Sequence, residues 1–247
     1  MLTKKLMREI LSHAEDEYPN ELCGVVSGGK YFRCRNAAKD PTKEVVMDKY
    51  DMLEFAEKIE AFVHSHPDAS SRMSQSDKVQ MEFFGVPYII VGYPAGDFGF
   101  YVPTGYKAPL LGRQFYHGIL DCYTLVRDFY AREMGITIPD FERADKWWED
   151  EHSTSLYMQN FAEAGFEPVD NLQYGDVIIC TVGDTKYPNH ALIYLGENGK
   201  FRSEETTDTF GTNMFLHHMY GRKSTREVYG DQWKDKTKVV VRHKEKL

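Results

Sequence analysis

A segment rich in proline and glycine divides this chain of 247 residues and sets the main limit on how it folds. Residues 102–113 read VPTGYKAPLLGR and contain two prolines and two glycines between regions of regular hydrophobic pattern. A usual domain holds roughly 100–200 residues, so a break here leaves two parts of domain size. We therefore predict a first domain over residues 1–104, a linker over 105–112 and a second domain over 113–247.

The composition excludes several classes of protein. Thirty lysine and arginine residues against 38 aspartate and glutamate residues give a net charge of −8, which argues against nucleic acid as a partner. The four cysteines, Cys23, Cys34, Cys122 and Cys180, are too few and too scattered for a disulfide scaffold. No apolar run approaches the roughly 20 residues of a membrane span, and the N-terminus lacks the apolar core of a signal peptide. We expect no membrane span and folding in a cytoplasm.

Hydrophobic patterns in the first part predict a mixture of helices and strands without regular alternation. Apolar residues fall on one helical face at Leu2, Leu6, Ile10 and Leu11, in a helix that ends before Pro19. Two further helices are predicted over residues 51–59 and from Ser74 onward. Strands are predicted over residues 21–28, 61–67 and 87–94, the first of them ending in a glycine hairpin turn.

The second part has helices first and strands later, which is typical of an α+β domain. A helix is predicted over residues 121–135, with Asp121 as its N-cap and Gly135 as its stop. A second helix is predicted over residues 155–166. The predicted strands cover residues 176–180, 190–196, 214–218 and 238–243.

Five polar residues of the first part form a candidate metal site. His64 and His66 are two apart on a predicted strand, so their imidazoles face the same way, and Asp77 lies on the following helix. Two histidine nitrogens and a carboxylate are a common catalytic zinc set that leaves one position for water, whose pKa zinc lowers to roughly 7. Glu21, on the first strand, is the candidate base. Ser74 is either an oxyanion donor or, with Asp77, a helix cap.

The pattern HxHP-x6-SxxD, preceded by a strand-borne glutamate, resembles the Mov34/MPN/PAD-1 family, the JAMM zinc metallopeptidases, over residues 1–103. The resemblance implies a mixed α/β fold and a Zn2+ cofactor held by His64, His66 and Asp77. It also implies Glu21 as general base and Ser74 as oxyanion helper. Members of this family cut peptide or isopeptide bonds, so one reading is a zinc isopeptidase that acts on host proteins.

The second part carries a candidate thiol site. Cys122 directly follows the predicted N-cap, and a thiol at a helix N-terminus has a lowered pKa because of the free amides and the helix dipole. Thiolate is the nucleophilic form of cysteine. His190 begins a predicted strand that can present it to the end of the helix. A third polar group must then orient the imidazole.

The segments GILDCYTLVRDFY, LQYGDVIIC and NHALIYLG are similar to the NlpC/P60 family of cysteine peptidases, which implies a papain-like α+β fold over residues 113–247. In that family a third polar residue follows the histidine by about a dozen positions, where this chain has Arg202, which cannot accept a hydrogen bond. An acidic insertion, SEETTDTFGTN, delays the next strand, so the third residue is His217 or His218. We choose His217. Tyr116 is a candidate for the tyrosine that orients the cysteine in many relatives.

Two such modules in this order resemble a family of tail tip assembly proteins of lambda-type long-tailed phages, through the segments DCYTLVRDFY and LHHMYGRKS. The resemblance implies a zinc-dependent (iso)peptidase and a thiol endopeptidase acting on murein stem peptides. It implies other tail tip proteins as partners, with a murein peptide or a protein as substrate. It places the chain in the host cytoplasm during assembly and at the virion tail tip at the cell wall. The alternative is an assembly factor whose peptidase sites are dispensable.

Overall fold

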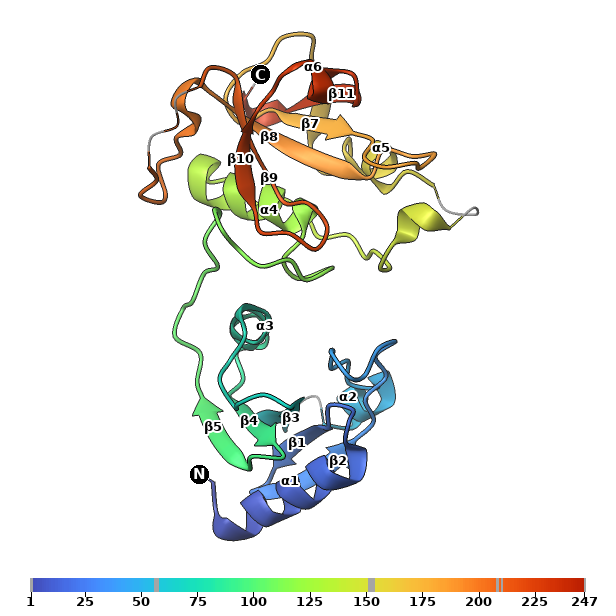
Figure 1. Cartoon of the computed structure of the whole chain (residues 1–247), viewed down its shortest axis with the longest axis vertical. Coiled ribbons are helices and arrows are strands. Elements are labelled where there is room, and N and C mark those ends of the chain that lie inside the picture. The colour runs from blue at the N-terminus through green and yellow to red at the C-terminus, as the bar shows by residue number, and fades with distance from the viewer. Residues whose placement is uncertain (1, 56–57, 151–153, 208, 210, 247) are drawn as a thin grey trace. The chain divides into compact units, whose positions relative to one another are not determined.

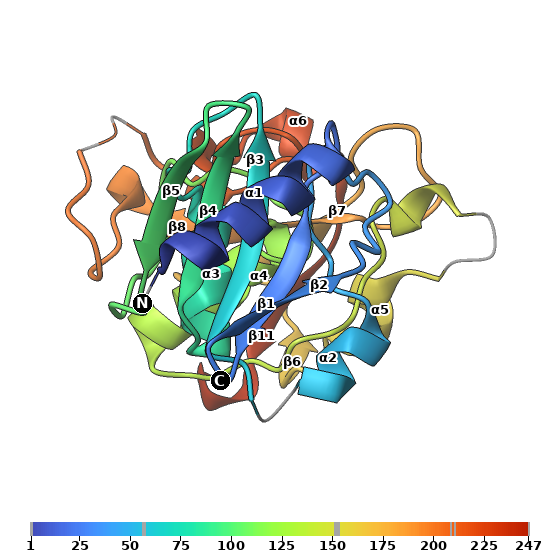
Figure 2. The ribbon, with the colours of Figure 1, turned by 90° about the horizontal axis from the view of Figure 1, so that it is seen from below.

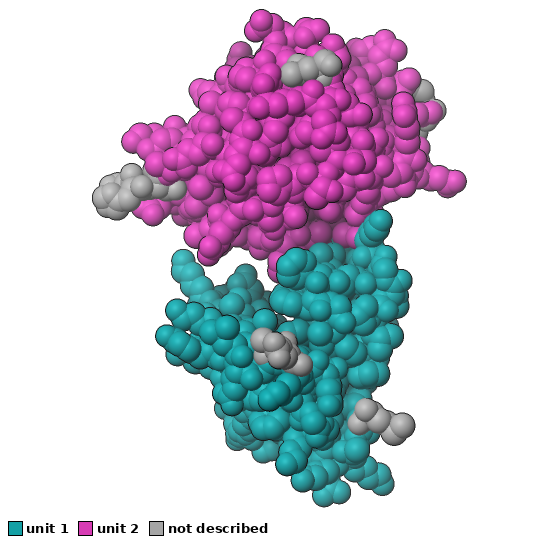
Figure 3. Space-filling model, turned by 180° about the vertical axis from the view of Figure 1, so that it is seen from behind, with its two compact units in different colours: residues 1–107 teal, residues 108–247 magenta. Residues whose placement is uncertain are grey.

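A computed structural model describes residues 2–55, 58–150, 154–207, 209 and 211–246. The chain forms two compact units, Met1–Lys107 and Ala108–Leu247, coloured separately in Figure 3. The division between them falls inside residues 105–112. Helices within the described ranges are all too short or too polar to cross a membrane.

The first unit is built on a five-stranded sheet in the order β2-β1-β3-β4-β5 (Figure 1). Only β3 and β4 run parallel in this sheet. Strand β1, which lies between β2 and β3, is buried along its whole length. Gly28 and Gly29, at φ 55° and 68°, form the predicted hairpin turn, since two residues with positive φ match the twist of the flanking strands. The strand bounds are β1 Cys23–Ser27, β2 Lys30–Cys34, β3 Ala61–Pro67, β4 Tyr88–Tyr93 and β5 Asp97–Tyr101.

Helix α1, Lys4–Glu17, lies across one face of this sheet (Figure 2) and buries Leu6, Ile10 and Ala14 against it, as the apolar spacing predicts. Helix α3, Gln75–Phe84, begins after Ser74, and Phe84 contacts Phe62 on the opposite sheet face from α1. Helix α2, Lys49–Phe55, is shorter than predicted. Residues 56–57 lie outside the described part, and Ile59 packs on the sheet from a non-helical segment.

The second unit confirms the α+β expectation, with helices before a six-stranded antiparallel sheet in the order β10-β9-β8-β7-β11-β6. The predicted strands β7, β8, β9 and β11 are present, whereas β6 and β10 carry no clear sequence pattern. The strand bounds are β6 Phe166–Pro168, β7 Val177–Cys180, β8 His190–Gly196, β9 Met214–His217, β10 Thr225–Val228 and β11 Thr237–His243.

Helix α4, Cys122–Phe129, starts after the N-cap Asp121, continues as a π-helical turn over Tyr130–Met134 and ends at Gly135 in the left-handed conformation, as predicted. Leu125 and Phe129 of α4 pack against one sheet face. The predicted helix over residues 155–166 is wrong in length: α5 spans Leu156–Asn160 only, and Gly165, at φ 88°, ends the turns before β6. The short helix α6, Asp231–Lys234, packs Trp233 on the other sheet face.

Candidate functional sites

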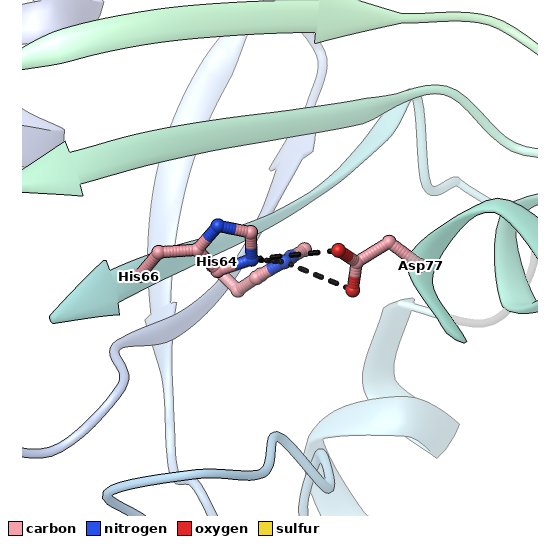
Figure 4. A group of neighbouring side chains, drawn as sticks. All are labelled: His64, His66 and Asp77. Atoms are coloured by element: carbon pink, nitrogen blue, oxygen red, sulfur yellow. Dashed lines mark hydrogen bonds and ion pairs between the residues drawn. The ribbon is translucent and has the colours of Figure 1, made fainter. Parts of the chain in front are cut away.

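Three side chains from β3 and α3 converge in the first unit (Figure 4). His64 and His66 point to the same side of β3, and the first turn of α3 brings Asp77 opposite them. The two Nε2 atoms lie 3.2 Å apart, and each is 3.4 Å from a different carboxylate oxygen of Asp77. One donor atom from each residue lies within 4.8 Å of the other two, which is the spacing of a metal site.

The helix cap and the metal site proposed for Ser74 and Asp77 are compatible. The Ser74 hydroxyl accepts a hydrogen bond from the Asp77 amide at 3.1 Å, and Asp77 Oδ2 accepts one from the Ser74 amide at 2.7 Å. This capping box holds the Asp77 carboxylate at the start of α3, where it also faces the imidazoles. The hydroxyl of Ser74 keeps its own proton, so the cap leaves it able to donate.

The donor set fits a zinc ion. A tetrahedral zinc with bonds of 2.0–2.1 Å requires its two nitrogen ligands to lie about 3.3 Å apart, close to the 3.2 Å between the imidazoles. His66 Nδ1 lies 2.9 Å from the carbonyl oxygen of Ser70, so it must donate there. That hydrogen bond leaves the Nε2 lone pair of His66 directed at the cluster, the arrangement found for ligating histidines.

The electrostatics of this cluster also suit a cation. Burial acts to raise the pKa of the Asp77 carboxyl, but hydrogen bonds from His64 and His66 outweigh it and hold that pKa well below its usual range. Burial acts to lower the pKa of His66, but the Asp77 carboxylate and the Ser70 carbonyl raise it above its ordinary value. The cluster therefore favours a positive charge opposite the Asp77 carboxylate, a place that a metal ion can take.

Glu21 lies beside the cluster but not on the strand. Strand β1 begins at Cys23, so the prediction that Glu21 belongs to it is wrong by two residues. Its position is set instead by the loop, because the Glu21 amide donates to the carbonyl of Pro41 at 2.7 Å and Asn36 holds its carbonyl at 3.1 Å. Burial raises the pKa of the Glu21 carboxyl, and the charges of the two nearby imidazoles oppose this shift. A raised pKa brings the carboxyl closer to neutral pH, where it exchanges protons best.

The second site is built at the first residue of α4. Asp121 caps the helix by accepting from the Thr124 amide at 2.9 Å, and Arg143 holds its carboxylate through two hydrogen bonds of 2.7 and 3.1 Å. Cys122 follows this cap and opens onto a cavity of about 360 Å³ whose wall also includes His190. The backbone of Ala191, which follows His190 on β8, contacts the Cys122 thiol. The structure therefore brings Cys122 and the start of β8 together.

The thiol differs from the sequence expectation in its charge. Burial raises the pKa of Cys122 to about 11, against the lowering predicted from the helix N-terminus, and it also lowers the pKa of His190 well below its ordinary value. Removing both groups from water penalises their charged forms more than the helix dipole helps the thiolate. Among the described residues, the thiol hydrogen bonds to the Tyr157 hydroxyl at 3.0 Å and not to His190. Both shifts favour the neutral forms of the thiol and of the imidazole.

The structure places His217, and not His218, against His190. His190 Nε2 and His217 Nδ1 lie 3.2 Å apart, and both rings are buried. His218 points elsewhere and packs on Phe115 with ring centroids 5.2 Å apart. Arg202, which stands about a dozen positions after His190, lies in a loop, and its backbone amide donates to the Glu133 carboxylate at 2.7 Å. The geometry supports the choice of His217, whose catalytic role stays a prediction.

Tyr157 is the residue that sequence patterns miss. It lies 35 residues after Cys122, on α5, and no motif marks it. The hydroxyl of Tyr116, the sequence candidate for this position, donates instead to Gln114 at 3.2 Å. Only the packing of α5 against the start of α4 reveals which tyrosine meets the thiol.

Loss of the Arg143 side chain should destabilise the second unit. In Arg143→Met the Asp121 carboxylate, whose side chain is 3% exposed, loses both hydrogen bonds to its cation. A buried carboxylate left without its partner costs about 3–5 kcal/mol of unfolding free energy, measured by urea denaturation. The matched control is Arg127→Met, whose pair with Asp140 is partly exposed to water and contributes less than about 1 kcal/mol. Equal losses in the two variants would contradict this assignment.

Comparisons with known proteins agree with the two units. A model described as the NlpC/P60 family matches residues 112–242, and one described as prokaryotic homologs of the JAB domain matches residues 3–101. A tail tip assembly protein K of Escherichia phage N15 is 36% identical over 251 aligned positions, 99% of this chain and 96% of that protein. The protein of the same name from Escherichia phage lambda is 35% identical over 188 positions, 75% of this chain and 82% of that protein. A JAB1/MPN domain protein from Archaeoglobus fulgidus is 29% identical over 42% of this chain and 86% of its own, with a TM-score of 0.28.

Proposed function

Because the chain belongs to the NlpC/P60 family and, over 99% of its length, to the family of phage tail tip assembly proteins K, we propose that it takes part in tail tip assembly and carries two centres that hydrolyse amide bonds. The observation that supports this best is that each unit gathers one set of reactive groups. The first unit gathers His64, His66 and Asp77. The second unit gathers Cys122 with His190 and, behind it, His217.

We assign the murein stem peptide as the substrate of the thiol site, in line with the family resemblance. Substrate binding displaces water from the cavity and brings the thiol from Tyr157 toward His190, which takes its proton. Cys122 Sγ then attacks the amide carbonyl, and His190 returns the proton to the leaving amine. Water hydrolyses the resulting thioester and restores the thiol. His217 holds the imidazole in place during both proton transfers.

The first unit is proposed as a zinc (iso)peptidase centre in which His64, His66 and Asp77 hold the ion. Bound zinc supplies Lewis acidity, which polarises a carbonyl and makes water acidic. Glu21 accepts a proton from the attacking water and delivers it to the leaving amine. Ser74 donates its hydroxyl proton to the developing oxyanion. The proposed substrate is a peptide or isopeptide bond of a protein.

Digestion of purified murein sacculi tests the thiol site directly. The whole chain, kept reduced, is expected to release stem peptide fragments that mass spectrometry identifies. Release should continue in the presence of a chelator, because Cys122 and His190 need no metal ion. Loss of all release on chelation would assign the cleavage to the zinc centre and contradict the thiol mechanism.

The burial of Cys122 favours a second candidate function, an assembly factor whose peptidase sites are dispensable. A thiol with a pKa of about 11 is a poor nucleophile until a substrate reorganises the site. Wild-type protein that releases no fragments, together with phages that form normal plaques while carrying both Cys122→Ala and Glu21→Gln, would support this alternative.

A further inference from the structure

We propose that Glu227 is a positioning residue of the thiol site, which sets where the protons lie on His217 and His190. The inference deepens the proposed thiol function and rests on it. The thiol site then consists of four side chains in series, which are Cys122, His190, His217 and Glu227. Nothing in the sequence pattern marks Glu227, which lies on β10 at the edge of the second sheet.

The pairing of β9 and β10 directs this carboxylate at the buried histidine. Thr225 lies opposite His217, and Glu227 lies opposite Phe215. Residues two apart on a strand share a face, so Glu227 and His217 point to the same side of the sheet. Glu227 Oε1 lies 3.2 Å from His217 Nε2, and Glu227 Oε2 accepts a hydrogen bond from Trp233 Nε1 at 3.1 Å.

These contacts determine one pattern of protons. An ionised carboxylate only accepts hydrogen bonds, so His217 must carry its proton on Nε2. Burial lowers the pKa of both His217 and His190, which leaves each ring with a single proton. His217 Nδ1 is then an acceptor, and His190 Nε2, 3.2 Å away, must donate to it. The remaining nitrogen of His190, Nδ1, is left with a lone pair that can take the thiol proton of Cys122.

The exposed fractions of these side chains fit a positioning role for Glu227. His217 is fully buried and His190 is 4% exposed, so neither ring has bulk water to orient it. The Glu227 side chain, by contrast, is 44% exposed at the surface of the sheet edge. Trp233 is 8% exposed and, through its indole nitrogen, prevents the carboxylate from turning away. The carboxylate therefore fixes the hydrogen-bond direction of two rings from the edge of the sheet.

Glu227→Gln should be more harmful than Glu227→Ala. In the glutamine variant the amide oxygen must accept from Trp233, so its NH2 group faces His217 Nε2. Both rings then reverse their protons, and His190 Nδ1 carries hydrogen and cannot act as a base. Alanine imposes no proton pattern, so part of the population keeps the productive one. A merely structural role predicts the opposite order, because alanine removes more contacts than glutamine.

The rate at which iodoacetamide modifies Cys122 at pH 7.5 measures this effect without murein, because alkylation, like attack on an amide, requires the thiol to turn from Tyr157 and give its proton to His190. Mass spectrometry of the Cys122 peptide separates its labelling from that of the other cysteines. We expect labelling to slow at least about tenfold in Glu227→Gln and less than tenfold in Glu227→Ala. Nitrogen-15 NMR of the histidine rings should show reversed protonated nitrogens in Glu227→Gln alone. Adding Trp233→Phe to Glu227→Gln frees the amide to turn and should restore part of the rate.

The matched control is Glu167→Gln, an exposed acid on the opposite edge strand that pairs with Lys244 and should leave the labelling rate unchanged. Unaltered ring protons and labelling in Glu227→Gln would overturn the role of Glu227 even if the wild type cleaves murein. Absence of murein cleavage by the wild type, with reversed protons and slow labelling in Glu227→Gln, would instead refute the proposed substrate and keep the positioning role.

Discussion

Cys122→Ala is expected to abolish the release of murein fragments by the thiol site. The alanine side chain carries no nucleophile, so the remaining residues of the thiol site can only bind the substrate. Removing the nucleophile of such a constellation lowers the rate on the order of a million-fold in a well-studied peptidase, so fragments should fall below detection. The measurement is the time course of stem peptide release from sacculi at equal protein concentration.

The matched control for Cys122→Ala is Cys180→Ala, because both replacements remove one sulfur atom from the second unit. Cys180 is fully buried in β7, and burial raises the pKa of its thiol, so it should not react. This variant should retain release at the wild-type rate once any loss of stability is corrected by assaying at low temperature. If release persists in Cys122→Ala and disappears in Cys180→Ala, the assignment of Cys122 as the nucleophile is wrong.

His64→Ala is expected to remove bound zinc from the first unit. The wild type should hold about one zinc per chain by elemental analysis, and a site reduced to His66 and Asp77 should lose nearly all of it because two ligands seldom retain the ion. A metal that binds only the folded form also stabilises it, by about 4 kcal/mol at a thousand times the dissociation constant. Addition of zinc should therefore raise the melting temperature of the wild type and leave that of the variant unchanged.

Glu21→Gln serves as the control for that experiment. Glu21 is assigned as the base and not as a ligand, so this variant should keep its zinc and the stabilisation that zinc brings while losing zinc-dependent peptide cleavage. Loss of zinc in Glu21→Gln would instead show that Glu21 is a zinc ligand. A wild type that binds no zinc, with His64→Ala of equal stability, would refute the metal centre.

The meeting of His64, His66 and Asp77 could be predicted from the sequence because each of these residues is placed by local structure. The alternation of a strand aligns His64 with His66, and a capping box at Ser74 sets the start of the helix that carries Asp77. Each of these relations spans no more than a few residues. Glu21 was predicted beside the cluster but on the wrong element, since loop contacts from Asn36 and Pro41 hold it there and no periodicity encodes them.

The thiol site could be predicted only in part because it depends on distant contacts. The N-cap Asp121 and the strand start at His190 were evident from patterns. The choice between His217 and His218 depends on where β9 ends after an insertion, and Tyr157 reaches the thiol from α5. The pKa of Cys122 is raised, whereas the sequence predicted a lowered pKa. A sequence shows the helix end that stabilises a thiolate but not the burial that destabilises it.

By itself, the sequence determined the two-part organisation, the order of helices and strands and the residue types able to hold a metal or attack an amide. Those properties follow from periodicity, caps and spacing, which act within one element at a time. The tertiary structure alone decided which groups meet across elements, from Arg143 on Asp121 to Glu227 behind His217. It also decided how far each is removed from water, because dielectric surroundings and hydrogen-bond direction arise only when separate segments pack together.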